Sequence, residues 1–163
     1  MNAQAYITIL ANRLSRYFDT KDVGTYPLPF DLVAELNASD EGYFLLKDIK
    51  TYSVKHNEYL YVKAYQVPLT KASVEPYLEY LKEQMRNLKT TTEHMSSLFA
   101  LVLVCEAGIE EGLAKELSKY KFHKDYAFSL KGWSDLAIYV VDVQTQKLLF
   151  NKAGKKNEQY FSF

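Results

Sequence analysis

The stretch WSDLAIYVVDV, residues 133–143, decides the fold of this chain, because it predicts a strand that is apolar on both faces. One face would carry Leu136, Ile138 and Val140, and the other would carry Ala137, Tyr139, Val141 and Val143. A strand of this kind lies at the centre of a sheet and is covered on both sides. We therefore expect either helices on both faces of the sheet or a partner subunit against one of them.

The only tryptophan, Trp133, stands at the start of this strand and is expected to fill the core or an interface. Gly132 allows the backbone to bend or bulge just before it. The alternative is that Lys131 and Trp133 form an exposed clamp for a ligand.

Hydrophobic periodicity and turn residues predict the other elements. In chain order they are a helix over 3–18, strands over 30–36, 43–54 and 59–67, a helix capped by Ser73 that ends near Leu88, a strand over 98–105, a short helix from Gly108, and strands over 122–130, 133–143 and 147–151. Polar turns at 37–42 and 55–58 join the first three strands into an antiparallel meander. The order α-β-β-β-α-β-α-β-β-β predicts an α+β fold, a largely antiparallel sheet with helices packed on it.

Length and composition favour a single domain over residues 1–163, with 48% hydrophobic and 25% charged residues. The longest apolar run, residues 98–105, is too short to span a bilayer, and no secretory signal is evident. The single cysteine, Cys105, fits a reducing cytoplasm. Three aromatic residues near the C-terminus, Tyr160, Phe161 and Phe163, predict a tail that docks onto the core, and Gly154 is expected to cap a turn before it.

The formal net charge is zero, which disfavours a dedicated nucleic-acid binder. The charges are nevertheless unevenly spread. Between Lys119 and Lys156 there are eight lysines against three aspartates, whereas residues 19–58 hold eight acids and four lysines. These lysines either decorate exposed strand ends or form a basic face for an anionic partner, nucleic acid included.

The predicted opening order α-β-β-β-α-β matches the core of the PD-(D/E)xK nucleases, which hold Mg²⁺ between carboxylates on adjacent strands. Asp48 and Lys50 have the acid-x-lysine spacing, and Asp31 or Glu35 would supply the second carboxylate. That spacing is expected about twice by chance in this composition. A metal-dependent nuclease is therefore the alternative hypothesis, with Mg²⁺ as its cofactor.

The three histidines and the cysteine match no metal-binding or nucleophile motif. His123 and Asp125 should point to the same strand face, and a Zn²⁺ site could in principle gather them with His94. His56 falls in a predicted turn and is expected to be solvated. Cys105 ends a buried strand and is expected to act as a small hydrophobic residue.

Two stretches, EHMSS (residues 93–97) and FHKDYAFSLKGWSD…VVD…NKAGK (residues 122–155), resemble a family of uncharacterised proteins from Firmicutes, known only as a domain of unknown function. The resemblance implies a bacterial cytoplasmic protein and carries no assigned activity. It rests on seven residues, which are the candidate binding residues: His94, Ser96, His123, Lys124, Lys131, Trp133 and Asp135.

The sequence as a whole predicts a non-catalytic binding or protein-interaction module that needs no cofactor. The doubly apolar strand and the 14 tyrosines favour a homodimer, because tyrosine is enriched at interfaces. The partner would be a second copy together with a small molecule or another protein, and no membrane.

Overall fold

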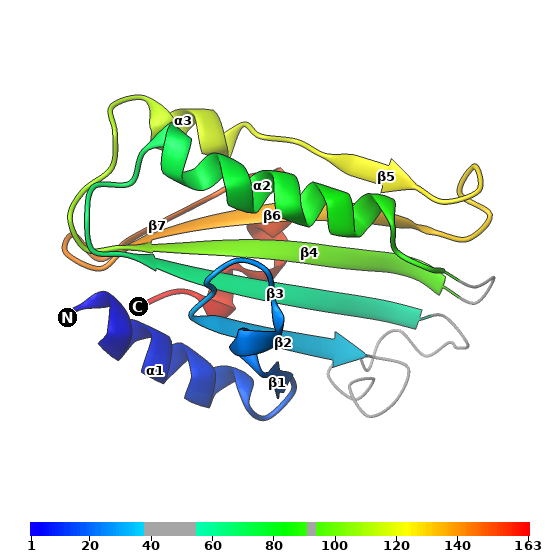
Figure 1. The fold of residues 1–163 in the computed structure, drawn as a ribbon, viewed down its shortest axis with the longest axis horizontal. Helices are drawn as coiled ribbons and strands as arrows, with labels where there is room; N and C mark the ends of the chain where they lie inside the picture. The colour runs from blue at the N-terminus through cyan, green and yellow to red at the C-terminus, as the bar shows by residue number, and fades with distance from the viewer. Residues whose placement is uncertain (38–54, 91–93) are drawn as a thin grey trace.

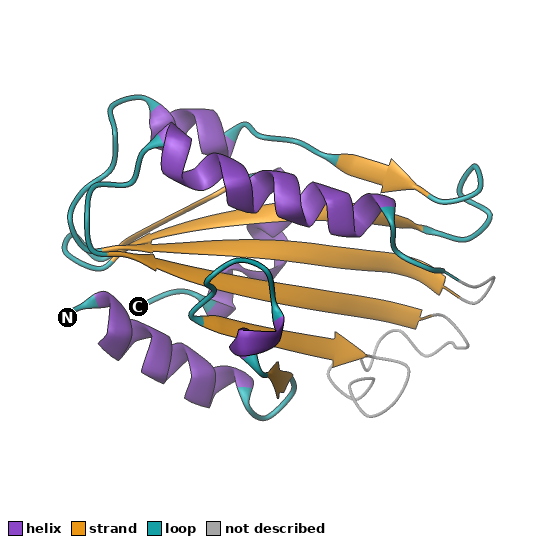
Figure 2. Cartoon of the chain, in the orientation of Figure 1, coloured by secondary structure: helices purple, strands orange, loops and turns teal. Residues whose placement is uncertain are grey.

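The computed structural model describes residues 1–37, 55–90 and 94–163, which form one mixed sheet with helices on both faces (Figure 1, Figure 2). Its elements are α1 (Ala3–Leu14), β1 (Asp19–Lys21), η1 (Val23–Thr25), β2 (Leu32–Asn37), β3 (Lys55–Tyr65), α2 (Lys71–Arg86), β4 (His94–Cys105), α3 (Leu113–Ser118), β5 (His123–Asp125), β6 (Trp133–Asp142), β7 (Lys147–Phe150) and η3 (Lys152–Tyr160). The order of helices and strands agrees with the predicted α+β order. The first strand of the structure is β1, however, whereas the predicted first strand, over 30–36, corresponds to β2. The strand predicted over 43–54 lies outside the described residues.

The middle strands of the sheet run parallel. The strand order is β1-β2-β3-β4-β6-β5, and β7 also pairs with β6. β4 pairs in parallel with β3 and with β6, whereas the other pairings are antiparallel. Parallel neighbours require a long crossover, which contains α2 between β3 and β4 and contains α3 between β4 and β6. The predicted antiparallel sheet is therefore mixed, because strand periodicity does not report strand direction.

The chain itself covers both faces of β4 and β6, which is the first of the two arrangements expected for a doubly apolar strand. α2 and α3 pack on one face, which we call the α2 face, against residues such as Leu101 and Ile138. α1, η3 and the C-terminal tail cover the other, which we call the η3 face, around Val102 and Tyr139. In Figure 1, α2 crosses in front of the sheet and η3, in red, lies behind it.

The C-terminal tail docks against α1, as its aromatic residues predicted. The Tyr6 hydroxyl donates to the Phe161 carbonyl oxygen at 2.6 Å, and Arg13 Nη1 donates to the carbonyl oxygens of Tyr160 and Ser162 at 2.6 and 2.9 Å. Phe161 is buried, with its ring 4.1 Å from that of Tyr139. Both ends of the chain are thereby held on the η3 face, and they lie close together in Figure 1.

Two predicted boundaries in the first half of the chain are wrong. Residues 55–58 do not form a turn but begin β3, where they pair in register with β4. The N-cap of α2 is Thr70 rather than Ser73. Thr70 accepts from the Ser73 N–H while the Ser73 side chain bonds the Thr70 backbone, so Ser73 completes a capping box from inside the first turn.

Two further differences lie after β4. The short helix begins at Leu113 rather than Gly108, with Gly112 as its left-handed N-cap residue. The strand predicted over 122–130 shortens to β5, because residues 127–129 have left-handed backbone conformations, with φ of 50°, 55° and 69°. Three consecutive residues of this kind end strand pairing and turn the chain towards β6.

Gly154 does not cap a turn but lies buried inside η3, against the ring of Tyr139. The Tyr139 hydroxyl donates to the Gly154 carbonyl oxygen at 2.7 Å. A Cβ atom at Gly154 would stand 3.0 Å from the Tyr139 ring, closer than ordinary van der Waals contact. The absence of a side chain thus sets how closely η3 approaches the sheet.

Gly154→Ala should lower the free energy of unfolding by about 1–3 kcal/mol, because the added methyl overpacks this contact. Urea denaturation followed by circular dichroism measures the change. Gly24→Ala is the matched control, since its Cβ would meet only the Asp22 side chain in an exposed turn and should change stability by no more than about 0.5 kcal/mol. Equal effects of the two variants would contradict tight packing of η3 on Tyr139.

Candidate functional site

A polar shelf lies on the η3 face, where β3, β4 and β6 begin. Two rows of register-paired residues cross the sheet there, His56–Ser96–Trp133–Asp125 and Glu58–Leu98–Asp135–His123. Paired residues project to the same side of a sheet, and Leu98 belongs to the core of the η3 face. The two rows, which we call the polar shelf, therefore share one face.

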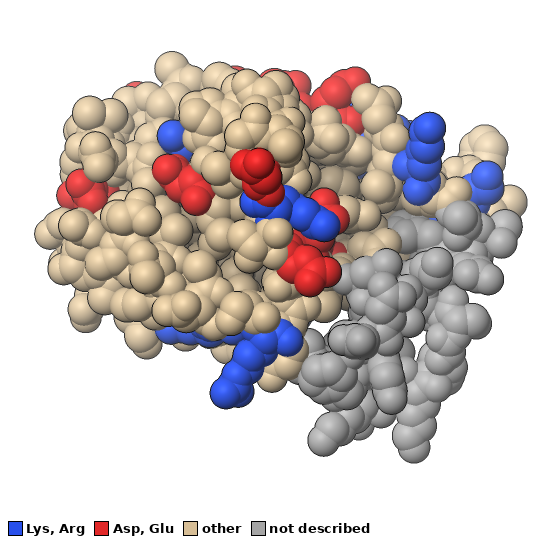
Figure 3. All heavy atoms as spheres, turned by 60° about the horizontal axis from the view of Figure 1, so that its bottom comes forward, with Lys and Arg blue, Asp and Glu red and all other residues tan. Residues whose placement is uncertain are grey.

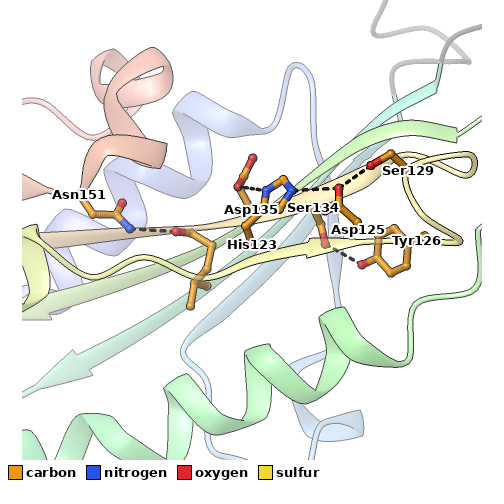
Figure 4. A network of polar contacts seen from close by, with 8 residues as sticks. His123, Asp125, Tyr126, Ser129, Ser134, Asp135 and Asn151 are labelled. Carbon is orange, nitrogen blue, oxygen red and sulfur yellow. Dashed lines mark hydrogen bonds and ion pairs between the residues drawn. The ribbon is translucent and has the colours of Figure 1, made fainter.

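His123 lies between two carboxylates on this shelf (Figure 4). Its Nδ1 is 2.7 Å from Asp135 Oδ1, and its Nε2 is 3.1 Å from Asp125 Oδ1. The hydrogen bond to Asp135, followed by the one to Asp125, raises the pKa of His123 above its ordinary value. Because a carboxylate faces each ring nitrogen, both nitrogens act as donors and the imidazolium form is favoured. His123 is therefore suited to hold positive charge rather than to accept a proton.

The prediction that His56 lies in a solvated turn is wrong. His56 is half-buried on β3, and both of its ring nitrogens are hydrogen-bonded. Its Nδ1 is 2.6 Å from Ser96 Oγ, and its Nε2 is 3.3 Å from Glu58 Oε1. Asn157 Nδ2 of η3 also donates to Glu58 Oε1, at 2.6 Å. Burial alone would raise the pKa of Glu58, but the hydrogen bond and the charge of His56, the hydrogen bond from Asn157 and the charge of Lys156 hold that pKa below its ordinary value. Glu58 is thus an ionised carboxylate in a buried position.

Asn151 joins η3 to the edge of β6, in the gap between β5 and β7. Its Oδ1 accepts from the Ile138 N–H at 2.9 Å, and its Nδ2 donates to the Leu136 carbonyl oxygen at 2.8 Å and to the Tyr120 carbonyl oxygen at 3.0 Å. The side chain is buried, and it takes the place of a pairing strand on the edge of β6 opposite β4, between the stretches paired with β5 and β7 (Figure 4). It thereby fixes the segment before β5 and the start of η3 relative to each other.

An open hollow of about 1100 Å³ lies between these two segments and next to the shelf. Five lysines line it, two from the segment before β5 and three from η3: Lys119, Lys121, Lys152, Lys155 and Lys156. Its acidic lining residues are Asp135, which is bonded to His123, and Glu158. Leu98 and Ala153 add apolar surface, and Tyr120 and Phe122 add aromatic surface. The hollow is therefore basic, with an apolar component.

The structure brings together four of the seven predicted binding residues, since Ser96, Trp133, Asp135 and His123 all lie on the polar shelf. Lys124 is on the opposite face of β5, where it pairs in register with the buried Ser134. Lys131 lies in the loop between β5 and β6. The side chain of His94 lies outside the described part of the chain.

The residues that sequence reasoning missed are His56, Glu58, Asn151 and Asn157. The two-residue spacing of His56, Glu58 and Leu60 was a usable signal, because residues at this spacing share one face of a strand. It was overlooked because Lys-His-Asn-Glu is also typical of a turn. The two asparagines carried no signal, since their roles depend on how η3 folds back onto the sheet.

The nuclease alternative gains no site from the described residues. Asp48 and Lys50 lie outside them. Asp31 Oδ2 accepts from the Ala64 N–H at 2.7 Å and pairs with Lys63, and Glu35 pairs with Lys21 at 3.8 Å. No group of three His, Cys, Asp or Glu residues that could hold a metal ion is found in residues 1–37, 55–90 and 94–163.

Cys105 is buried, as predicted, at the end of β4. Burial and the nearby Asp142 raise the pKa of its thiol to about 12. Because the thiolate is the reactive form of cysteine, this side chain is inert at neutral pH.

The fold and the site together define an α+β protein with a mixed sheet, a polar shelf on one face and a basic hollow beside it. The chain belongs to the family described as Domain of unknown function (DUF8052), whose model matches residues 2–163. The resemblance to a family of unknown function is thus confirmed. Searches of curated proteins and of solved structures found no match. No helix in the described part of the chain is long and apolar enough to cross a membrane.

The stability contributed by His123 should decline as the pH rises. Its pKa in the folded protein is raised above the ordinary 6.5, so the contribution is complete below pH 6.5 and is lost as the pH passes through the folded pKa. Asp135→Asn should return the NMR-measured pKa of His123 towards 6.5, and by more than Asp125→Asn does, because Asp135 is the larger cause. An unchanged titration in Asp135→Asn would contradict this arrangement.

Proposed function

We propose that the protein binds a small anionic molecule in the hollow between η3 and the segment before β5. The observation that carries the proposal is the convergence of five lysines from two separate segments on one hollow. None of these five lysines has an ion-pair partner within 4.0 Å among the described residues. Their charges are therefore available to a ligand, and only that of Lys156 also acts on the nearby carboxylate of Glu58.

The electrostatics of the lining favour an anion. Of the two acids that line the hollow, Asp135 is engaged by His123, whose raised pKa favours its positive form. A concave surface lined by one sign of charge concentrates its field and attracts ligands of the opposite sign. We infer a ligand with at least one anionic group, which the lysines would contact, and an apolar part against Leu98 and Ala153.

The dimensions favour a small molecule over a nucleic acid. The volume of about 1100 Å³ is slightly above the range of small-molecule sites, which run to about 1000 Å³. On the face shown in Figure 3, acidic and basic side chains are interspersed and separated by wide uncharged areas. That face carries no basic stripe of the kind that a nucleic-acid surface needs.

We also propose a bacterial, cytoplasmic setting, which the lone, buried and unpaired cysteine supports. The homodimer stays a prediction that rests on the tyrosine content, because helices of the same chain cover both faces of β6. Multi-angle light scattering should give about twice the 18.9 kDa of one chain. A mass of one chain at all concentrations would contradict it.

Inorganic pyrophosphate is the first probe of the hollow, and it should raise the melting temperature. A ligand at about 100 times its Kd stabilises by about 2.7 kcal/mol, which corresponds to several degrees for a domain of this size. The double variant Lys121→Ala/Lys155→Ala, with one change on each wall, should lose most of this shift.

Lys115→Ala is the matched control, since Lys115 is exposed on α3 and does not line the hollow. It should keep the full shift. Equal shifts in the wild type and the double variant would place the anion elsewhere. No shift with pyrophosphate, phosphate or citrate would contradict the proposal.

A further inference from the structure

Ser96, His56 and Glu58 form a continuous chain of hydrogen bonds on the polar shelf. Ser96 Oγ is 2.6 Å from His56 Nδ1, and His56 Nε2 is 3.3 Å from Glu58 Oε1. An ionised carboxylate only accepts hydrogen bonds, so His56 Nε2 carries the hydrogen that faces Glu58. In neutral His56 the lone pair is then on Nδ1, directed at the Ser96 hydroxyl.

The Glu58 carboxylate, the last member of this series of hydrogen bonds, is also held by a residue of η3. Glu58 is buried, and Asn157 of η3 donates to the same oxygen that faces His56. The contacts described above keep Glu58 ionised in spite of its burial. A fixed anion beside Nε2 both orients the imidazole and stabilises the imidazolium that forms when Nδ1 takes a proton.

The backbone also positions the histidine. His56 and Ser96 are register partners on the parallel strands β3 and β4, and the register shifts between Lys55 and His56. Such irregularities re-aim side chains and occur often beside active sites. Ser96 lies two residues before Leu98, which lines the hollow, so the hydroxyl is roughly 7 Å along the strand from that lining.

We propose that Ser96 is a nucleophile activated by His56 and oriented through Glu58, and that the protein hydrolyses carboxylic esters at the polar shelf. A nucleophile within hydrogen-bond reach of a base, with the base oriented by a third group, is the arrangement that acyl transfer requires. The ester would carry an anionic group that reaches the lysines of the hollow. This preference for an anionic ester rests on the proposed function, whereas the role of Ser96 does not.

The proposed ester hydrolysis requires only the ester, water, Ser96 and His56. Ser96 Oγ attacks the ester carbonyl carbon while its proton moves to His56 Nδ1. The bond from the carbonyl carbon to the alkoxy oxygen then breaks, and His56 returns the proton to the leaving alcohol. Water, deprotonated by His56, cleaves the acyl-Ser96 bond to release a carboxylic acid and restore the hydroxyl. The net reaction is ester plus water to acid plus alcohol.

A fluorophosphonate probe tests the nucleophile without any knowledge of the substrate. Phosphonylation forms a P–O bond to Ser96 and releases fluoride, and intact-mass spectrometry with peptide mapping should place one adduct on Ser96. Ser96→Ala should abolish the adduct, and His56→Ala should slow its formation at least about 100-fold, the usual contribution of a general base. Ser15→Ala is the control, because Ser15 is exposed at the end of α1, and it should label like the wild type.

A second variant covers the case in which Ser96→Ala does not fold. Ser96→Cys replaces the hydroxyl by a thiol, and the other cysteine, Cys105, is buried with a raised pKa and gives no background. Iodoacetamide should alkylate Cys at position 96 faster in the presence of His56 than in the additional His56→Ala variant. Equal rates, or an absence of fluorophosphonate adduct on wild-type Ser96, would overturn the proposal.

The anionic preference is tested separately. In Lys121→Ala/Lys155→Ala the KM for a phenyl ester that carries a carboxylate should rise by a larger factor than the KM for a neutral phenyl ester. If Ser96 is labelled but the double variant changes KM by the same factor for both esters, the role of the hollow is refuted. The assignment of Ser96 as the nucleophile would then still stand. If the wild-type protein binds pyrophosphate but Ser96 is not labelled, only the proposal that Ser96 is a nucleophile is refuted.

Discussion

The burial of β4 and β6 on both faces is the constraint on which the rest of the structure depends. Along their middle sections these strands carry apolar side chains on either side, and their residues there are almost completely buried. The crossover helices α2 and α3 cover one face as a consequence of parallel connectivity. The second face has no crossover helix, so α1, η3 and the tail must close it. The bonds from Tyr6 and Arg13 to the tail carbonyl oxygens hold that second layer in place.

The candidate site arises where this second layer ends. η3 packs on Tyr139 through Gly154 and bonds Glu58 of the shelf through Asn157. Most of the shelf positions carry polar side chains, and the buried Glu58 among them is held by hydrogen bonds from His56 and Asn157. Asn151 sets the distance between η3 and the segment before β5, and the hollow lies between them. The close packing of one glycine and the amide of one asparagine thus determine the walls of the site.

The two histidines of the shelf have different environments, and these suit them to different tasks. His123 faces a carboxylate with each nitrogen, so it is favoured as a cation and adds to the charge of the lysines beside it. His56 faces one carboxylate and one hydroxyl, which leaves one nitrogen able to accept a proton from Ser96. Environment rather than residue type therefore separates a group that would hold an anion from a group that would move a proton.

The sequence by itself determined the α+β class, the doubly apolar strand, the docked tail, the basic character of residues 119–156 and the shared face of His123 and Asp125. All of these are local properties, because period, apolar content and charge can be read within one segment. Only the tertiary structure decided that β3, β4 and β6 run parallel, that His56 meets Ser96, and that Lys121 and Lys155 line the same hollow. Those features join residues that lie tens of positions apart. Their register follows from the burial of the whole sheet and the crossovers between strands, which no single segment specifies.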